Sequence, residues 1–276
     1  MSKINEIQIQ TYNMCNSKCI MCPYKDISDS PLKMEDSLFI KIIDNIVDGI
    51  NEGLIKIPYI HPFFQNEPFM DKSIFDKVEY IQEKIPDAYI SIITNGTFFN
   101  IYKEKITKMK IDELKFSLYG EDLDSFNYIT NLNYKIENYL KMVEAAVYIA
   151  KNSSFEFILD STWKNEKTRG FSSRAGFLSN NKIIHNVVNG CKWKRDEWLH
   201  ILADGIVVIC CMDWKREVVI GDLKEQSIND IILSKKRRDV IDKINGAVSE
   251  KNFICKRCEK ALGDEDGDKN LLKFNL

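Results

Sequence analysis

Apolar residues follow two different spacings before residue 161. Short runs in which apolar and polar residues alternate, or in which Ile, Val, Tyr and Phe dominate, indicate β-strands. These runs are Glu6–Tyr12, Leu54–Ile60, Ala88–Thr94, Glu113–Leu118 and Ser154–Asp160. Longer segments with apolar residues at helical spacing lie between them: Asp36–Glu52, Ser73–Lys84, Tyr102–Met109 and Ile136–Ala150. Strands that alternate with helices predict βα units, so we expect an α/β fold with a parallel sheet.

The pattern changes after residue 160. The segment from Ser161 to Phe171 is too short for the helix and strand of another complete βα unit, so the parallel part is expected to stop at about five or six strands. Farther on, Trp198–Leu202 and Ile206–Cys210 predict a β-hairpin with a turn that ends in Gly205. The basic run Lys235–Arg238 predicts a solvated helix face.

Composition narrows the class of protein. The chain has 276 residues, 44% of them apolar and 29% charged, with a formal net charge of −2. The balanced charge argues against a polyanion-binding protein, so no nucleic acid partner is expected. No apolar run reaches about 18 residues, so we expect no membrane-spanning helix. The N-terminal MSKINEIQIQ lacks the apolar core of a signal peptide, so a cytoplasmic location is expected, where disulfides are rare.

The eight cysteines therefore need another explanation. The first group is Cys15, Cys19 and Cys22, and the polar residues between them favour a loop rather than buried structural thiols. Structural zinc usually takes four ligands, whereas this group offers three and has no histidine nearby in sequence. Three soft thiolates with an open position suit an iron–sulfur cluster that leaves one iron free.

The Cys-x3-Cys-x2-Cys spacing, placed directly after a predicted strand, resembles the signature of the radical S-adenosylmethionine (SAM) superfamily. The resemblance implies a partial TIM-like barrel over residues 1–185 and a 4Fe-4S cluster on these three cysteines. It also implies SAM on the open iron and an external one-electron donor such as flavodoxin or ferredoxin. Reductive cleavage of SAM in this family yields a 5′-deoxyadenosyl radical that abstracts hydrogen. Met21 stands where the family usually has an aromatic residue near adenine.

Segments at the predicted strand ends extend the resemblance. Gln65-Asn66-Glu67-Pro68 stands in place of a Gly-Gly-Glu-Pro segment, which implies that Glu67 binds the methionine amino group. Thr94-Asn95-Gly96-Thr97 resembles Thr-Asn-Gly-Thr, and Ser117-Leu118-Tyr119-Gly120 resembles Ser-Leu-Asp-Gly. A capping turn at Glu67 and a simple turn at Asn95 remain the structural alternatives. The resemblance implies SAM contacts from Met21, Asn66, Glu67, Thr94, Asn95, Ser117 and Tyr119.

The second cysteine group resembles the auxiliary-cluster extension called SPASM or, in its one-cluster form, twitch. Cys191 is followed by Gly205 and Cys210, and Cys255-x2-Cys258 comes later in the chain. These four cysteines complete one auxiliary 4Fe-4S cluster in residues 186–276 and leave Cys211 over. Zinc is the alternative for this group, because four thiolates also suit zinc.

A fully ligated auxiliary cluster accepts an electron more readily than it binds substrate. The compact layout resembles the radical dehydrogenase of butirosin (aminocyclitol) biosynthesis, which implies oxidation of a secondary alcohol on a small polyol, sugar or cyclitol. By that resemblance Arg174 faces the substrate hydroxyl. Because arginine stays protonated, hydrogen bonding to the developing oxyanion suits it better than a role as base.

Other functions stay open from sequence. In an epimerase the spare thiol of Cys211 would return a hydrogen atom to the substrate. Peptide modifiers of the family often carry a separate recognition domain, for which we expect no room before the first strand. A non-catalytic cluster or zinc module is a more remote alternative. Several aromatic residues either line a pocket or simply pack: Tyr119, Trp163, Trp193, Trp198 and Trp214.

Overall fold

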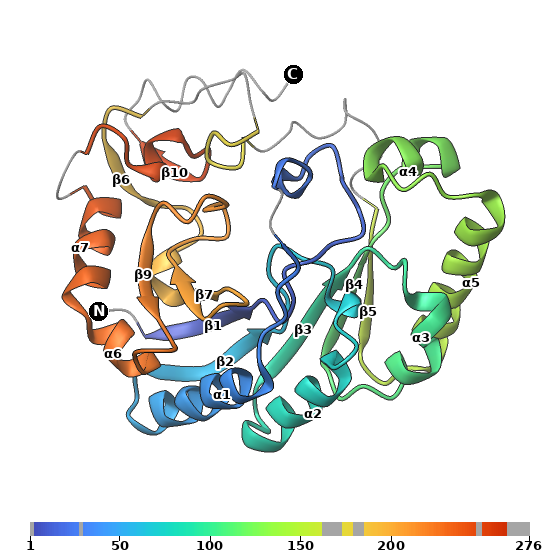
Figure 1. Ribbon diagram of the computed structural model, residues 1–276, viewed down its shortest axis with the longest axis horizontal. Coiled ribbons are helices and arrows are strands. Elements are labelled where there is room, and N and C mark those ends of the chain that lie inside the picture. Colours follow the sequence, from blue (N-terminus) through green and yellow to red (C-terminus); the bar gives the residue numbers. More distant parts are fainter. Residues whose placement is uncertain (1–2, 28–29, 162–172, 179–184, 247–249, 264–276) are drawn as a thin grey trace.

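Parallel strands form the first part of one continuous sheet in the computed structural model, which describes residues 3–27, 30–161, 173–178, 185–246 and 250–263 (Figure 1). The parallel strands are β1 (Ile4–Ile9), β2 (Ile55–His61), β3 (Tyr89–Thr94), β4 (Glu113–Ser117) and β5 (Glu156–Asp160). Each lies within two residues of its predicted start, and they pair in chain order. The predicted α/β fold is confirmed.

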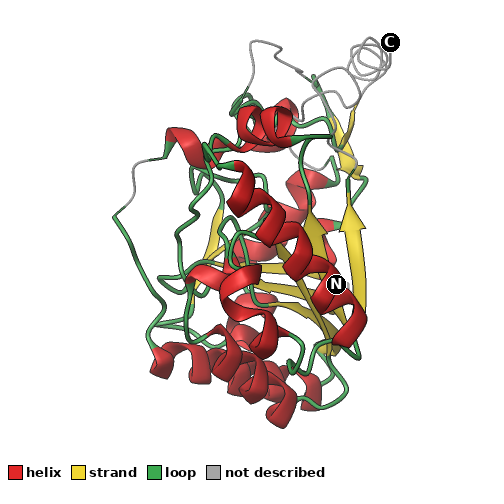
Figure 2. Ribbon diagram, turned by 90° about the vertical axis from the view of Figure 1, so that its right-hand side faces the viewer, coloured by secondary structure: helices red, strands yellow, loops and turns green. Residues whose placement is uncertain are grey.

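Helices cover the outer face of this sheet, as Figures 1 and 2 show. They are α1 (Asp36–Asn51), α2 (Ile74–Lys84), α3 (Phe99–Ile106) and α5 (Ile136–Asn152). Helix α4 (Leu123–Thr130) lies instead beyond the strand ends, beside the loop that follows β1 (Figure 1). In α1 the buried residues Phe39, Ile42, Ile43 and Ile46 recur at three- and four-residue spacing, which places them on the face toward the sheet. The sequence did not predict α4, which begins at a capping box formed by Asp122 and Ser125.

The predicted hairpin is confirmed, and it extends the same sheet. Strand β7 (Trp198–Ile201) pairs in parallel with β1, and β8 (Ile206–Val208) and β9 (Val219–Asp222) add antiparallel to it. The sheet order is β5-β4-β3-β2-β1-β7-β8-β9. The edge of the parallel strands next to β1 is therefore covered by the segment that carries the second cysteine group.

Helices α6 (Ile228–Leu233) and α7 (Lys235–Ile244) pack against β9, and α7 also contacts β6 (Val188–Cys191). A small antiparallel pair joins β6 to β10 (Ala261–Gly263). The basic run at the start of α7 is helical, but Arg237 is 1% exposed. Its guanidinium donates to the carbonyls of Ile232 and Asp196, which corrects the expectation that the whole run is solvated.

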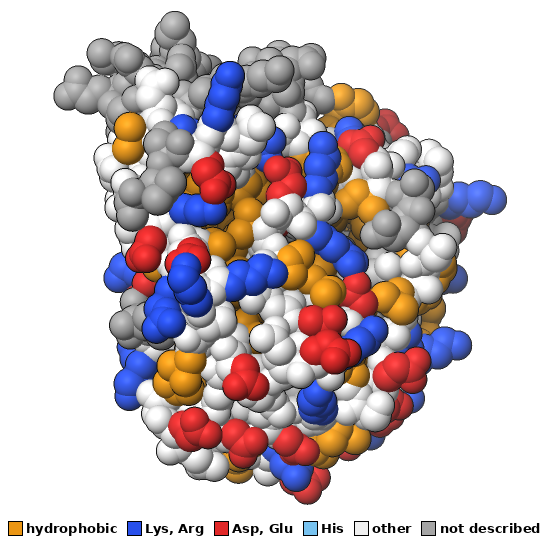
Figure 3. Space-filling model, turned by 60° about the vertical axis from the view of Figure 1, so that its left-hand side comes forward, with side chains coloured by type: hydrophobic (Ala, Val, Ile, Leu, Met, Phe, Trp, Pro, Cys, Tyr) orange, Lys and Arg blue, Asp and Glu red, His pale blue; other side chains and the backbone are white. Residues whose placement is uncertain are grey.

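Lys, Arg, Asp and Glu side chains are interspersed on the face drawn in Figure 3. No described helix is long and apolar enough to cross a membrane. Trp163 and most of the segment from Ser161 to Phe171 lie outside the described residues.

Candidate active site

The first cysteine loop follows β1 and is attached to the end of α4. The backbone N–H of Lys18 donates to Thr130 O at 3.0 Å, and that of Ile20 donates to Ile129 O at 2.9 Å. Burial raises the pKa of the Cys15 thiol, and Glu67, Cys19 and Cys22 raise it further. Burial and the neighbouring Cys22 raise the pKa of Cys19 to about 12. The loop thus gathers the three thiols within electrostatic range of one another.

This donor set fits a cationic iron–sulfur core. The metal ligand is the thiolate, and crowded, buried thiolates repel each other unless positive charge lies between them. Cys15, Cys19 and Cys22 provide three soft donors in such an arrangement, so they are the residues that would hold the SAM-binding cluster.

The predicted residues Glu67, Thr94 and Asn95 come together beside this loop. Glu67 is 2% exposed, and its Oε1 accepts from Thr94 Oγ1 at 2.7 Å and from the Phe69 N–H at 3.2 Å. Its Oε2 accepts from the Asn95 N–H at 2.9 Å. Burial raises the pKa of the Glu67 carboxyl to about 7 despite these hydrogen bonds. Pairing of Glu67 with the methionine amino group stays a prediction, since both oxygens here bond to the protein.

Asn95 links the end of β3 to the cysteine loop. Its Nδ2 donates to Asn16 Oδ1 at 2.9 Å and to Ser17 Oγ at 3.2 Å. Its Oδ1 accepts from the backbone N–H of Thr97 at 3.0 Å. Asn95 therefore forms the turn that its sequence predicts and also fastens the loop between Cys15 and Cys19.

Asn66 and the residue before it shape the turn after β2. The backbone N–H of Phe64 donates to Asn66 Oδ1 at 2.7 Å, whereas Asn66 Nδ2 is buried without a hydrogen-bond partner among the described residues. Gln65 has φ 52°, a left-handed conformation that a glycine in its place would adopt freely. The backbone thus makes the turn of a glycine-containing segment without the glycines.

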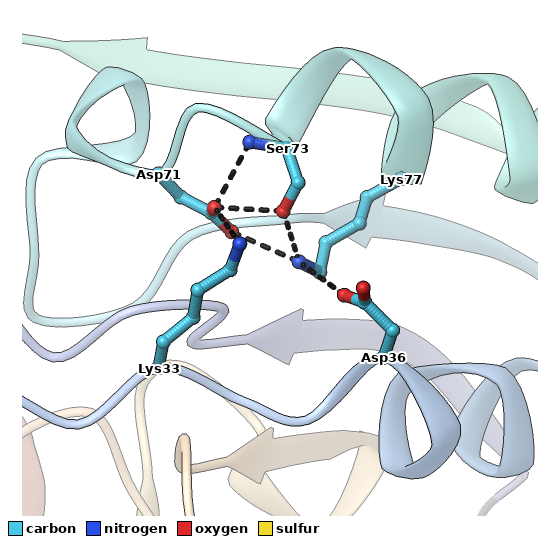
Figure 4. Close-up of polar contacts among 5 residues, drawn as sticks. All are labelled: Lys33, Asp36, Asp71, Ser73 and Lys77. Atoms are coloured by element: carbon cyan, nitrogen blue, oxygen red, sulfur yellow. Dashed lines mark hydrogen bonds and ion pairs between the residues drawn. The ribbon is translucent and has the colours of Figure 1, made fainter.

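A charged network supports the connection from β2 to α2 (Figure 4). Lys77 Nζ lies 3.1 Å from Asp71 Oδ2 and 3.3 Å from Asp36 Oδ1, and Lys33 Nζ lies 3.3 Å from Asp71 Oδ1. Ser73 Oγ donates to Asp71 at 2.8 Å. Asp71 and Lys77 are 1% and 4% exposed, so this network joins the segment after Glu67 to the start of α1 from within the protein.

Met21, Ser117 and Tyr119 lie beside the first cysteine group. Met21 is buried and packs with Cys19 and Ile129, and Tyr119 borders this small cluster. Burial raises the pKa of the Tyr119 hydroxyl, as does the nearby Cys19, while a hydrogen bond with Ser117 opposes the increase. Ser117, which ends β4, and Tyr119, which follows that strand, therefore lie close to the cysteine loop that contains Met21.

The second cysteine group is assembled from separate segments. Cys191 ends β6, Cys210 follows β8, Cys255 lies within the 3₁₀ turn Ile254–Arg257, and Cys258 directly follows that turn. Burial raises the pKa of Cys255, and the neighbouring Cys258 and Cys191 add to the effect. Across the described ranges, no three His, Cys, Asp or Glu residues are placed to hold a single metal ion.

Backbone donors point at two of these sulfur atoms. The N–H of Met212 lies 3.4 Å from Cys210 Sγ, and the N–H of Lys260 lies 3.4 Å from Cys258 Sγ. Such donors stabilise thiolate ligands and tune the clusters they hold, so this donor set also fits an iron–sulfur cluster.

Arg174 lies between the two cysteine groups. Its positive charge favours the thiolates of both Cys22 and Cys211, and its Nη1 lies 3.8 Å from Met212 Sδ. Arg174, Ala175 and Gly176 have φ values of 50°, 55° and 78°, a run of left-handed residues that costs free energy at the first two.

Neighbours of the second cysteine group hold this strained turn. Ser173 Oγ donates to Glu259 Oε2 at 2.6 Å, and the N–H of Gly176 donates to Ser173 Oγ at 3.2 Å. Backbone strain at Arg174, a residue near both cysteine groups, is typical of a functional position.

A polar pocket opens between residues that flank both groups. It is lined by Gln10, Asn13, Tyr24, Ile27, Gln65, Leu202, Trp214 and Arg216. Trp214 Nε1 is buried and has no hydrogen-bond partner among the described residues, so it is available to a ligand oxygen. The Arg216 guanidinium pairs with the Asp204 carboxylate, which neutralises its charge.

Among these lining residues, the sequence suggested only Trp214 as a pocket residue, and it singled out Gln65 for a different reason, as a replacement for a glycine. Proximity to the cysteines was the available signal for the others: Asn13 and Tyr24 flank the first group, and Arg216 follows Cys211.

Two families match the sequence. Residues 9–158 match the family described as the radical SAM superfamily, and residues 191–259 match SPASM, described as an iron-sulfur cluster-binding domain. The first match implies SAM and a 4Fe-4S cluster, and the second implies auxiliary iron–sulfur binding. The description of the second region therefore favours iron–sulfur over the zinc alternative.

Curated relatives match about half of this chain. The "Probable GTP 3′,8-cyclase" of Thermoplasma volcanium is 29% identical over 142 residues, which are 51% of this chain and 40% of the relative. That of Methanocella arvoryzae is 27% identical over 149 residues, which are 53% of this chain and 45% of the relative. The chain thus spans less than half the length of these relatives.

Solved structures share the fold across nearly the whole chain. BtrN in complex with AdoMet and 2-DOIA superposes with a TM-score of 0.65 at 18% identity, covering 95% of this chain and 94% of that one. Streptococcus suis SuiB bound to the precursor peptide SuiA has a TM-score of 0.65 at 13% identity, covering 99% and 71%. The anSMEcpe structure with bound AdoMet has a TM-score of 0.59 at 14% identity, covering 99% and 93%. At these identities the likeness establishes the fold alone.

Proposed function

This chain belongs to the radical SAM superfamily, and from that premise we propose that it is a dehydrogenase that oxidises a secondary alcohol on a small polyol, sugar or cyclitol to a ketone. The proposed ligands of the SAM-binding cluster are Cys15, Cys19 and Cys22. Those of one auxiliary cluster are Cys191, Cys210, Cys255 and Cys258. Residues 1–185 and 186–276 form the two functional parts, and an external flavodoxin or ferredoxin supplies the electron for cofactor cleavage.

The observation that carries the proposal is the place of Arg174 between the two cysteine groups. A substrate held against Arg174 lies within reach of chemistry at both groups. The guanidinium keeps its proton, so it donates a hydrogen bond to the substrate oxygen and stabilises negative charge as that oxygen loses its proton. The strained turn that presents Arg174 adds support, because local strain persists where function requires it.

The chemistry balances only if an electron acceptor is present. When bound, SAM and its cluster supply a 5′-deoxyadenosyl radical that removes one hydrogen atom from a C–H bond. To become a ketone, the remaining carbinol carbon must lose one electron and its hydroxyl must lose one proton. The second cysteine group is proposed to hold the acceptor of that electron, and Arg174 stabilises the oxygen that loses the proton.

The polar pocket of about 30 Å³, which has room for one hydroxyl-sized group, supports a neutral, hydroxylated substrate. Its polar lining offers amide groups from Gln10, Asn13 and Gln65, together with the indole N–H of Trp214, which has no partner in the described parts of the chain. The Arg216–Asp204 pair leaves no net charge there to favour an anionic substrate. Hydroxyl groups match such donors and acceptors, and the indole ring offers a flat apolar surface to a sugar or cyclitol ring.

The place of Cys211 disfavours the epimerase alternative. Its sulfur accepts a hydrogen bond from Arg195 at 3.1 Å, and its carbonyl accepts one from Gln65 at 3.2 Å. The hydrogen bond from the Arg195 guanidinium favours the thiolate form of Cys211, which has no hydrogen atom to return to a substrate.

The experiment combines product analysis with an isotope label. The anaerobically reconstituted protein is incubated with SAM, a reductant and a panel of inositols, aminocyclitols and hexoses in deuterated water. A ketone formed in step with 5′-deoxyadenosine supports the proposal. Deuterium in an otherwise unchanged substrate skeleton indicates epimerisation. Turnover of GTP or of a peptide without any ketone would place the chain with its cyclase relatives or its peptide-binding structural neighbours, and would overturn the proposal.

A further inference from the structure

A buried guanidinium lies beside the second cysteine group. Arg195 is in the 3₁₀ turn Arg195–Glu197 and is 5% exposed. Its guanidinium carbon lies 4.5 Å from the ring centroid of Trp193 and 4.3 Å from that of Trp198. Contact with two indole rings fixes the position of the cation, because a guanidinium stacks on aromatic faces.

This cation is directed at sulfur. Arg195 Nη2 donates to Cys211 Sγ at 3.1 Å, and the charge of Arg195 also reaches Cys210, one of the proposed cluster ligands. Its Nε and Nη1 are buried and have no hydrogen-bond partner among the described residues. Burying a cation is costly unless negative charge faces it. A cluster bound by four thiolates supplies that negative charge.

We propose that Arg195 is a positioning residue that raises the electron affinity of the auxiliary cluster. Its fixed positive charge stabilises the reduced state, which carries one more negative charge than the oxidised state. Its hydrogen bond holds Cys211 in place next to the ligand Cys210 and stabilises negative charge on sulfur. The inference rests on the ligand set and the electron-acceptor role given under the proposed function, and it does not depend on the identity of the substrate.

The test measures the midpoint potential of the auxiliary cluster alone. The background variant carries C15A, C19A and C22A, so that only the second cluster is bound. An EPR-monitored redox titration then measures the potential of that cluster. We expect R195Q to lower the potential by at least about 59 mV, which is a tenfold weaker affinity for one electron. R195K keeps the positive charge, so its midpoint potential is expected to lie closer to that of the parent than to that of R195Q. R195M provides a second uncharged variant if R195Q binds less iron.

The matched control is R237Q. Arg237 is also a buried arginine of this region, but its described hydrogen bonds to Ile232 and Asp196 go to backbone carbonyls. R237Q is expected to lower the melting temperature and to shift the potential much less than R195Q. An unchanged potential in the uncharged variants, or equal shifts in R195K and R195Q, overturns the proposal. Absence of ketone formation in the parent protein contradicts the proposed function but leaves this measurement decisive.

Discussion

A buried carboxyl group lies beside the first cysteine group, and a buried guanidinium lies beside the second. The carboxyl group is that of Glu67, which acts electrostatically on Cys15. The guanidinium is that of Arg195, which contacts Cys211 and acts on Cys210. Nearby negative charge lowers the reduction potential of a cluster and nearby positive charge raises it. Arg195 thus favours a second cluster that accepts an electron, whereas Arg174 near Cys22 and Asp213 near Cys255 act in the opposite direction on their own groups.

The chain also builds the two groups differently. The first occupies one loop that follows β1, and its spacing is visible in the sequence. The second combines the end of β6, the turn after β8 and the 3₁₀ turn Ile254–Arg257. Because β7 pairs with β1, the sheet itself fixes where the second group lies relative to the first.

Removing one ligand of the first group is expected to have the largest effect. Cys19→Ser should lower 5′-deoxyadenosine formation by more than about 100-fold, since changes even to residues behind the ligands cost about 10–100-fold. Bound iron should fall from about eight to about four atoms per chain. Both are measured after anaerobic reconstitution, by chromatography and by iron assay. Cofactor cleavage that persists in this variant would show that the first group is not the SAM site.

Removing one ligand of the second group should separate the two activities. Cys255→Ser is expected to lose a similar amount of iron but to keep 5′-deoxyadenosine formation within about tenfold of the parent. Ketone formation should fall by at least about 100-fold, because the substrate radical then lacks its electron acceptor. The ratio of ketone to 5′-deoxyadenosine measures the split. If both products fall together, the assignment of cofactor cleavage to the first group and of electron acceptance to the second group is wrong.

The fold and the first group were accessible from sequence because local patterns specify them. Alternating strands, amphipathic helices and the cysteine spacing in one loop each depend on neighbours in the chain. Helix α4 was missed because its amphipathic stretch is short, although its N-terminal cap was present in the sequence as Asp122 and Ser125.

Long-range contacts explain what the sequence did not predict. The contact of Arg195 with Cys211 and the pocket lined by Gln10 and Trp214 arise from packing between separate segments. Trp193 and Trp198 are close to Arg195 in the chain, but the sequence alone does not show that both rings contact its guanidinium. The internal hydrogen bonds of Glu67 also depend on β3 lying next to β2.

A third change addresses the residue between the groups. Arg174→Gln is expected to lower ketone formation by about 100-fold, as loss of one donor to a developing oxyanion does, while 5′-deoxyadenosine continues to form. Arg174→Lys keeps the charge but not the forked donor, so its rate of ketone formation should lie between those of the parent and Arg174→Gln. Measuring both kcat and the substrate KM for ketone formation distinguishes a role in the reaction from a role in substrate binding. Equal losses of ketone and 5′-deoxyadenosine would instead indicate a general disturbance of the site.

The smallest expected effect concerns the charged network of Lys33, Asp71 and Lys77, which supports the segment that follows Glu67. Lys77→Met leaves the buried Asp71 with Lys33 as its remaining cation, so we expect a loss of about 3 kcal/mol in the free energy of unfolding. Lys84→Met is the matched control, because its ion pair with Asp44 is exposed to solvent and should contribute little to the free energy of unfolding. Denaturant unfolding of the metal-free protein measures both. A similar loss in the two variants would contradict a special role for the buried pair.

The pH dependence of the same network sharpens this test. Burial alone would raise the pKa of Asp71, but the hydrogen bond from Ser73 and the charge of Lys77 outweigh it and hold the pKa below its ordinary value of 3.8. The ionised carboxylate therefore contributes stability above pH 3.8, and this contribution is lost as the pH falls through the lowered pKa. The difference in unfolding free energy between the parent and Asp71→Asn should accordingly be constant near neutral pH and shrink only in the acidic range. A difference that instead grows toward low pH would contradict the lowered pKa and, with it, the view that Lys77 holds this segment through the charge on Asp71.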